Sequence, residues 1–186
     1  MIRSRELFAT QGLLVAIVDA PSDRQQSPFL SGFRQTREHT SDVKALIAWL
    51  RQQARVPIWL VGTSRGTQSA AFIATQLRSE EDGPDGLVLT SSILRDPRGR
   101  PVSDMPLDRI TVPVLVVHHK EDGCSGTAFA DVPRLMSRLT STSRKELMVF
   151  EGGVNRGDPC EAFAYHGYNG LEREVVAKIA DWIVAR

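Results

Sequence analysis

The sequence is poor in the features that mark several other classes of protein. Aromatic residues make up only 6% of the 186 residues, which is too few for a surface that stacks bases. Lys and Arg number 23 and Asp and Glu number 22, so the basic excess of a nucleic-acid-binding protein is missing. No apolar run approaches the roughly 20 residues that a membrane-spanning helix needs. We therefore expect neither a nucleic-acid partner nor a membrane span.

Cysteine is also scarce, and no leader segment is visible. Two cysteines, Cys124 and Cys160, are too few to indicate a redox compartment by their number alone. The start of the chain, Met1 to Phe8, lacks the apolar core of a secretory signal. The length and the ordinary hydrophobic content of 41% predict a single globular domain over residues 1–186. The oligomeric state is not indicated.

Short apolar runs alternate with longer amphipathic segments along the chain, which is typical of βαβ units. The runs are almost continuously apolar, as expected of strands covered on both faces. This pattern predicts the α/β class: a three-layer sandwich with a mostly parallel sheet of about five or six strands. Five of these strands can be placed, at Leu13–Asp19, Ile58–Gly62, Gly86–Ser91, Val114–His118 and Glu146–Phe150.

Helical patterns occupy the intervals between these strands. Ser41 and Asp42 supply N-cap chemistry for a helix from Ser41 to Ala54, which is followed by Pro57. The segment Ser92–Val112 is short, polar and rich in proline, so no large cap domain is expected. Further helices are predicted at Gly66–Leu77, Ala128–Leu139, Leu171–Val184 and within the first ten residues.

The second apolar run leads directly into Gly62-Thr63-Ser64-Arg65-Gly66, a Gly-x-Ser-x-Gly motif. A serine held on a sharp turn from strand to helix projects its hydroxyl away from the sheet, and flanking glycines avoid steric clashes. The helix N-terminus then offers the Arg65 N–H to a developing oxyanion. The motif alone is weak, because Ser64 could instead be a simple helix N-cap. The strand before it and the helix after it favour a nucleophile.

A serine nucleophile needs a base and an orienting carboxylate, and in this motif's usual setting the chain order is Ser, acid, His. Of the four histidines, His166 lies between the last strand and the last helix, where that order requires the base. Asp122 follows the fourth strand in an Asp-Gly turn and is the preferred acid. Glu121 and Asp96 are the other candidates for the acid.

A metal site is the alternative to this triad. His118, His119, Asp122 and Cys124 are all possible ligands and lie close together in the sequence. However, adjacent residues of a strand point to opposite faces, and the spacing matches no structural zinc pattern. We therefore expect neither a metal nor another cofactor.

The predicted triad also bears on the two cysteines. Cys124 follows Asp122 by two residues and Cys160 precedes His166 by six, so contact between acid and base brings the cysteines near each other. We therefore predict a disulfide, which would close a loop of about 35 residues and contribute about 3–4 kcal/mol. Such a bond would favour an oxidising compartment, periplasmic or extracellular.

From about Leu13 to the C-terminus, these features resemble the α/β-hydrolase superfamily. The resemblance is carried by the elbow at Ser64, by Asp122 after a strand and by His166 before the last helix. Two further stretches, Val18–Asp23 and Cys160–Ile183, look like parts of small bacterial hydrolases. The resemblance implies acyl chemistry on a small-molecule ester substrate. The predicted function is a serine hydrolase that cleaves small or exposed esters.

One departure from the superfamily leaves alternatives open. Such hydrolases usually begin with additional strands, and a loop after one of them donates a second N–H to the oxyanion. The chain as given begins too late to include that loop, so an upstream segment or a weakened enzyme is expected. The loop Ala20–Arg34 is another possible source of the donor, through Ser22 or Asp23. An acyltransferase with the same triad and a non-catalytic binding protein are the alternative functions.

Overall fold

The computed structural model describes residues 2–77 and 83–185, and in these ranges four strands form one parallel sheet. The sheet has the order β1-β2-β3-β4, so each strand lies beside its neighbour in sequence. The strands are β1 (Trp59–Thr63), β2 (Gly86–Thr90), β3 (Val114–His119) and β4 (Lys145–Phe150). Each agrees within a residue with a predicted strand. β2 and β3 are entirely buried, as their unbroken apolar sequences predicted.

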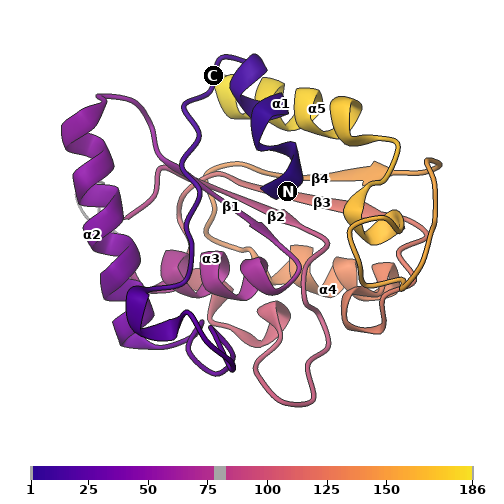
Figure 1. Ribbon diagram of the computed structural model, residues 1–186, viewed down its shortest axis with the longest axis horizontal. Coiled ribbons are helices and arrows are strands. Elements are labelled where there is room, and N and C mark those ends of the chain that lie inside the picture. The colour runs from indigo at the N-terminus through magenta and orange to yellow at the C-terminus, as the bar shows by residue number, and fades with distance from the viewer. Residues whose placement is uncertain (1, 78–82, 186) are drawn as a thin grey trace.

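Helices cover both faces of this sheet and make three layers (Figure 1). α1 (Arg5–Thr10) and α5 (Glu172–Val184) lie on one face, and α3 (Arg65–Gln76) and α4 (Val132–Arg138) lie on the other. α2 (Arg37–Gln53) packs beside α3 near the β1 edge. The predicted α/β sandwich is therefore confirmed, with four strands instead of five or six. No helix of the described ranges has the length and apolar character needed to cross a membrane.

The run Leu13–Asp19, predicted as a strand, is not one. Residues 13–20 have no regular secondary structure, and Leu14 is 70% exposed. Leu13 and Val15 still pack against the α1/α5 side of the sheet. A strand needs a neighbour that supplies backbone hydrogen bonds, and among the described residues no strand pairs with this run. Its apolar composition could not reveal the missing neighbour.

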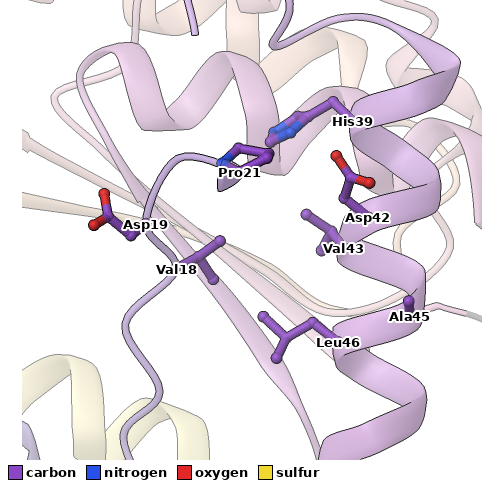
Figure 2. A pocket seen from close by; sticks show the side chains of 8 residues that line it. All are labelled: Val18, Asp19, Pro21, His39, Asp42, Val43, Ala45 and Leu46. Carbon is purple, nitrogen blue, oxygen red and sulfur yellow. The ribbon is translucent and has the colours of Figure 1, made fainter. Parts of the chain in front are cut away.

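The same stretch of chain lines a pocket of about 330 Å³ against α2. Figure 2 shows Val18, Asp19 and Pro21 on the loop side and His39 and Leu46 among the helix residues opposite. Burial lowers the pKa of His39, and neither ring nitrogen has a hydrogen-bond partner within the described chain. Ser64, Asp122 and His166 do not line this pocket.

Two predicted boundaries shift for local reasons. α2 begins one turn before Ser41, because the Thr36 side chain accepts a hydrogen bond from the His39 N–H and caps the helix there. The predicted helix Ala128–Leu139 begins instead at Val132, and Pro133 lies in its first turn. Neither shift changes the order of elements.

The segment Ser92–Val112 is a structural part of the core and forms no cap. It contains two short 3-10 turns, Val102–Asp104 and Leu107–Arg109. Its apolar residues pack under α3 and α4. Those that are at least 95% buried are Ile93, Leu94, Val102, Met105, Leu107 and Ile110.

A matched pair of leucine truncations tests the position of the first apolar run. We expect Leu14→Ala to change the free energy of unfolding by less than about 0.5 kcal/mol, because its side chain is mostly in solvent. Leu87→Ala, in the fully buried β2, should cost about 2–5 kcal/mol. Urea denaturation measures both values. A loss of several kcal/mol in Leu14→Ala would mean that the run is a buried strand after all.

Candidate active site

Ser64 occupies the turn between β1 and α3 with a backbone φ of 51° and ψ of −122°. A positive φ is strained for a residue with a side chain and costs of order 1–3 kcal/mol. Two sets of hydrogen bonds hold this conformation. The Ser64 N–H donates to the Thr90 carbonyl at 3.0 Å, and the Ser64 carbonyl accepts from the N–H and hydroxyl of Thr67 at 2.9 and 2.6 Å. Such local strain is typical of functional turns.

The two glycines of the motif differ in their structural importance. A Cβ at Gly62 would lie 2.6 Å from the Gly66 carbonyl oxygen, so a side chain there cannot be accommodated without movement. A Cβ at Gly66 would meet nothing within 4 Å. The prediction that both glycines avoid clashes is therefore right for Gly62 and wrong for Gly66.

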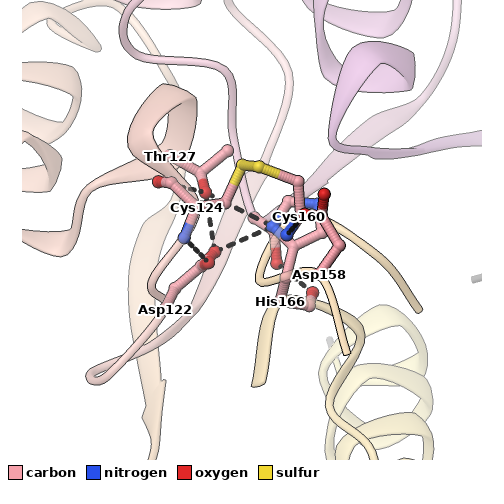
Figure 3. The surroundings of a disulfide bond; sticks show 7 residues. Asp122, Cys124, Thr127, Asp158, Cys160 and His166 are labelled. Atoms are coloured by element: carbon pink, nitrogen blue, oxygen red, sulfur yellow. Dashed lines mark hydrogen bonds and ion pairs between the residues drawn. A yellow bond between two sulfur atoms is a disulfide. The ribbon is translucent and has the colours of Figure 1, made fainter. Parts of the chain in front are cut away.

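Asp122 and His166 form a buried pair (Figure 3). The Asp122 Oδ2 lies 3.0 Å from the His166 Nδ1, and the two side chains are 0% and 4% exposed. In this arrangement Nδ1 carries the proton that the carboxylate accepts. The other ring nitrogen, Nε2, is buried and has no hydrogen-bond partner within the described residues. The pair thus has the geometry of an acid that orients a base.

Two further groups hold the Asp122 carboxylate. The Thr127 hydroxyl donates to Oδ2 at 2.8 Å, and the Cys124 N–H donates to Oδ1 at 3.0 Å. Thr127 is completely buried and also lies 3.3 Å from the His166 Nδ1. The role of Thr127 was not predicted, although a hydroxyl five residues after Asp122 was a usable signal.

The end of β2 connects the elbow at Ser64 to the loop that contains His166, here called the histidine loop. The Ser64 N–H binds the Thr90 carbonyl, and the next residue, Ser91, has its hydroxyl 2.8 Å from the His166 carbonyl. Ser64 and His166 therefore flank the same strand end. In the described chain no hydrogen bond joins the Ser64 hydroxyl to the imidazole, so the contact between nucleophile and base stays a prediction.

Tyr168 anchors the histidine loop to β3. Its hydroxyl donates to the Val117 carbonyl at 2.8 Å and lies 3.2 Å from the Ser91 hydroxyl. Burial raises the pKa of Tyr168, so the phenol is neutral. The residue has a left-handed φ of 56° and ends the short turn that contains His166. Ser91 and Tyr168 were not found from the sequence, because their partners lie more than 50 residues away.

The residues weighed as metal ligands have other roles in the structure. The His118 Nε2 accepts the Ser92 N–H at 2.8 Å, and burial lowers the pKa of His118 to about 4, so this ring is neutral. His119 stacks on Tyr165 with ring centroids 4.3 Å apart. Cys124 is bonded to another cysteine. These side chains therefore do not converge on a common centre.

Cys124 and Cys160 form the predicted disulfide, with the Cα atoms 4.6 Å apart (Figure 3). Cys124 lies in the turn that holds Asp122. Cys160 lies in the exposed segment 151–163, which leads to His166. The disulfide thus ties the turn that holds Asp122 covalently to the segment that precedes His166.

The donors for an oxyanion were predicted at the start of α3 and in the loop Ala20–Arg34. Arg65 is the first residue of α3, where N–H groups lack intrahelical partners. The loop contains a short 3-10 turn, Ser22–Arg24, and among the described contacts no hydrogen bond connects it to Ser64. The second donor therefore stays a prediction.

Solved structures with similar folds have hydrolytic names. The chain aligns with a sugar hydrolase from Lactococcus lactis at a TM-score of 0.64 and 18% identity, covering 97% of this chain and 79% of that one. A structure from work on the metagenome-derived lipolytic enzymes LipS and LipT gives a TM-score of 0.66 at 14% identity, covering 98% and 86%. The chain has an α/β-hydrolase fold.

A third α/β-hydrolase structure, the monoacylglycerol lipase of Paleococcus ferrophilus, gives a TM-score of 0.54 at 16% identity, covering 78% of this chain and 75% of that one. No protein-family model matches the sequence, and no curated protein matches it. At identities this low, the likeness establishes the α/β-hydrolase fold and leaves the reaction to be argued from the site.

The glycine geometry predicts different outcomes for two equivalent substitutions. We expect Gly62→Ala to cost about 1–3 kcal/mol of stability, because its Cβ would overlap the Gly66 carbonyl. Gly66→Ala should be neutral or stabilising by up to about 1 kcal/mol, since alanine favours a helix and the space is open. Equal losses in both variants on chemical denaturation would contradict this account of the elbow.

The disulfide predicts a large effect on stability. The double variant Cys124→Ser/Cys160→Ser should lose about 3–4 kcal/mol in urea denaturation, because the bond closes a long loop of the unfolded chain. Wild-type protein denatured with a reducing agent is the control and should behave like the double variant. A difference below about 1 kcal/mol between oxidised wild type and double variant would be incompatible with a stabilising bond.

Proposed function

We propose that this protein is a serine hydrolase that cleaves small or exposed esters through an acyl-enzyme intermediate. Ser64 would be the nucleophile, His166 the general base, Asp122 the residue that orients the imidazole, and the Arg65 N–H one donor to the oxyanion. The hydrolytic names of proteins with this fold agree with such an activity at a coarse level.

The observation that carries the proposal is the buried pair of Asp122 and His166 beside the elbow. A carboxylate bound to Nδ1 fixes the tautomer in which Nε2 is a free acceptor, as a base for a serine hydroxyl requires. Nε2 is buried without a partner in the described chain. A buried polar atom without a hydrogen bond is costly, and such atoms are often explained by a catalytic role.

The proposed reaction has two steps. The Ser64 oxygen attacks the ester carbonyl while the His166 Nε2 takes its proton, and the Arg65 N–H stabilises the negative oxygen that forms. The alcohol then leaves with that proton and the acyl group remains on Ser64. Water attacks this acyl group while His166 accepts one of its protons, and His166 then returns that proton to the Ser64 oxygen as the carboxylic acid is released. Asp122 stabilises the imidazolium in both steps without becoming protonated.

The expected substrate size follows from the segment Ser92–Val112. Because the apolar residues of this segment are packed into the core and its longest exposed stretch lies in the short loop 95–100, the segment forms no domain over the elbow. A site without a large cap favours small esters, or esters exposed on larger molecules, over a long lipid chain that must be enclosed.

Substitution of the nucleophile tests the proposal. Ser64→Ala should lower the rate of hydrolysis of 4-nitrophenyl butyrate by at least about a thousandfold, since the acyl-enzyme cannot form. Ser137→Ala, at an exposed position of α4, is the control and should keep the wild-type rate in this assay. Hydrolysis by Ser64→Ala at the wild-type rate would show that another group performs any observed reaction.

A further inference from the structure

Several arginines lie close to the Ser64 turn in the sequence and the fold, although the chain has a net charge of only +1. The loop after β2, residues 91–100, contains three arginines and one aspartate. Two more arginines are near the start of α3: Arg65 is its first residue, and Arg34 binds the Ser69 hydroxyl on the same helix. The loop 91–100 follows β2 and α3 follows β1, and Ser64 lies in the turn between β1 and α3.

Hydrogen bonds show that the three segments meet. The Gln35 and Gln68 side chains both donate to the Arg100 carbonyl, at 2.9 and 3.0 Å. Arg34, beside Gln35, donates to the Ser69 hydroxyl on α3 at 3.2 Å. The loop before α2, the start of α3 and the loop after β2 are therefore connected at one place.

The one carboxylate of this loop, Asp96, already has protein partners. Asp96, whose side chain is 3% exposed, binds the Arg65 guanidinium, the Gln68 amide and the Arg98 N–H. Burial opposes ionisation of Asp96, but these bonds hold its pKa below the ordinary value. Asp96 therefore fixes Arg65 in place, and Asp131 pairs with Arg95 in the loop after β2. Neither carboxylate pairs with Arg34 in the described chain.

Arg34 is the cation whose position is least explained by folding. It is half-buried, and within the described chain its side chain pairs with no carboxylate, only with the Ser69 hydroxyl. Burial and the nearby Arg65 both lower the pKa of Arg34, as expected for two cations held close together. A guanidinium in such a place is suited to bind a carboxylate of a ligand.

The distance to Ser64 suits a single small substrate. Ser69 lies five residues after Ser64, which is about 7 Å along the axis of α3. Arg65 and Ser69 are four residues apart, so they share one face of the helix. We propose that Arg34 and Arg65 form an anion subsite, and that the ester cleaved at Ser64 carries a carboxylate. This inference rests on the proposed function of Ser64.

Two pairs of esters test the subsite. On the acyl side, mono-4-nitrophenyl glutarate is compared with its neutral methyl ester. On the alcohol side, 4-carboxyphenyl butyrate is compared with its methyl ester. Wild type should have the higher kcat/KM for the charged member of at least one pair. This preference should shrink as sodium chloride is added, because salt screens the attraction. The pair that shows the preference identifies the side of the ester that the arginines bind.

Substitutions then assign the preference to Arg34. Arg34→Gln should lower the ratio of kcat/KM between charged and neutral esters by about tenfold or more, and Arg34→Lys should restore part of it. Arg37→Gln, three residues away at the exposed start of α2, is the control and should keep the wild-type ratio. The melting temperature of each variant shows that it is folded.

The possible failures are distinguishable. Equal rates of wild type on charged and neutral esters, or a ratio unchanged by Arg34→Gln, would overturn the subsite while leaving the hydrolase intact. If wild type cleaves neither member of either pair, the proposed function itself is contradicted.

Discussion

The hydrogen bond from the Ser64 N–H to the Thr90 carbonyl is the contact around which the candidate site is organised. It fixes the strained turn after β1 to the end of β2, and the next residue, Ser91, contacts the backbone of His166. The sheet is entirely parallel in its described part, so the loops that follow all four strands emerge at the same edge. Asp122 follows β3 and His166 follows β4, so two loops distant in sequence meet at the edge of the sheet where Ser64 also lies.

Buried polar contacts then give this edge its rigidity. Asp122 receives hydrogen bonds from Thr127, from the Cys124 N–H and from His166, and Tyr168 anchors the histidine loop to β3. The disulfide adds a covalent link between the same two loops. Several independent constraints thus act on one pair of side chains, which is how a site keeps the orientation that acid–base chemistry requires. The loop after β2, with its three arginines, is joined to the same elements, since the Gln68 amide donates a hydrogen bond to Asp96.

Local signals in the sequence predicted the parts of this arrangement that depend on local chemistry. Apolar runs located β1 to β4, and glycines around a serine located the elbow. The order of nucleophile, acid and base selected Asp122 and His166, and the structure brings these two together. The cysteine pair was predicted from that contact and is confirmed. Two predictions failed because they depended on surroundings that the local sequence does not show: Leu13–Asp19 lacks a neighbouring strand, and Gly66 faces open space. The roles of Ser91 and Tyr168 arise only where separate strands end together.

The central claim is that Ser64 is a nucleophile activated by His166, and a covalent probe tests it most directly. The oxidised protein is treated with a fluorophosphonate, digested, and examined by tandem mass spectrometry to locate the phosphonyl group. The account predicts a single adduct, on the Ser64 hydroxyl, that is lost in His166→Ala while the fold is retained. Absence of an adduct on the wild-type protein, or an adduct on a different residue, would contradict it.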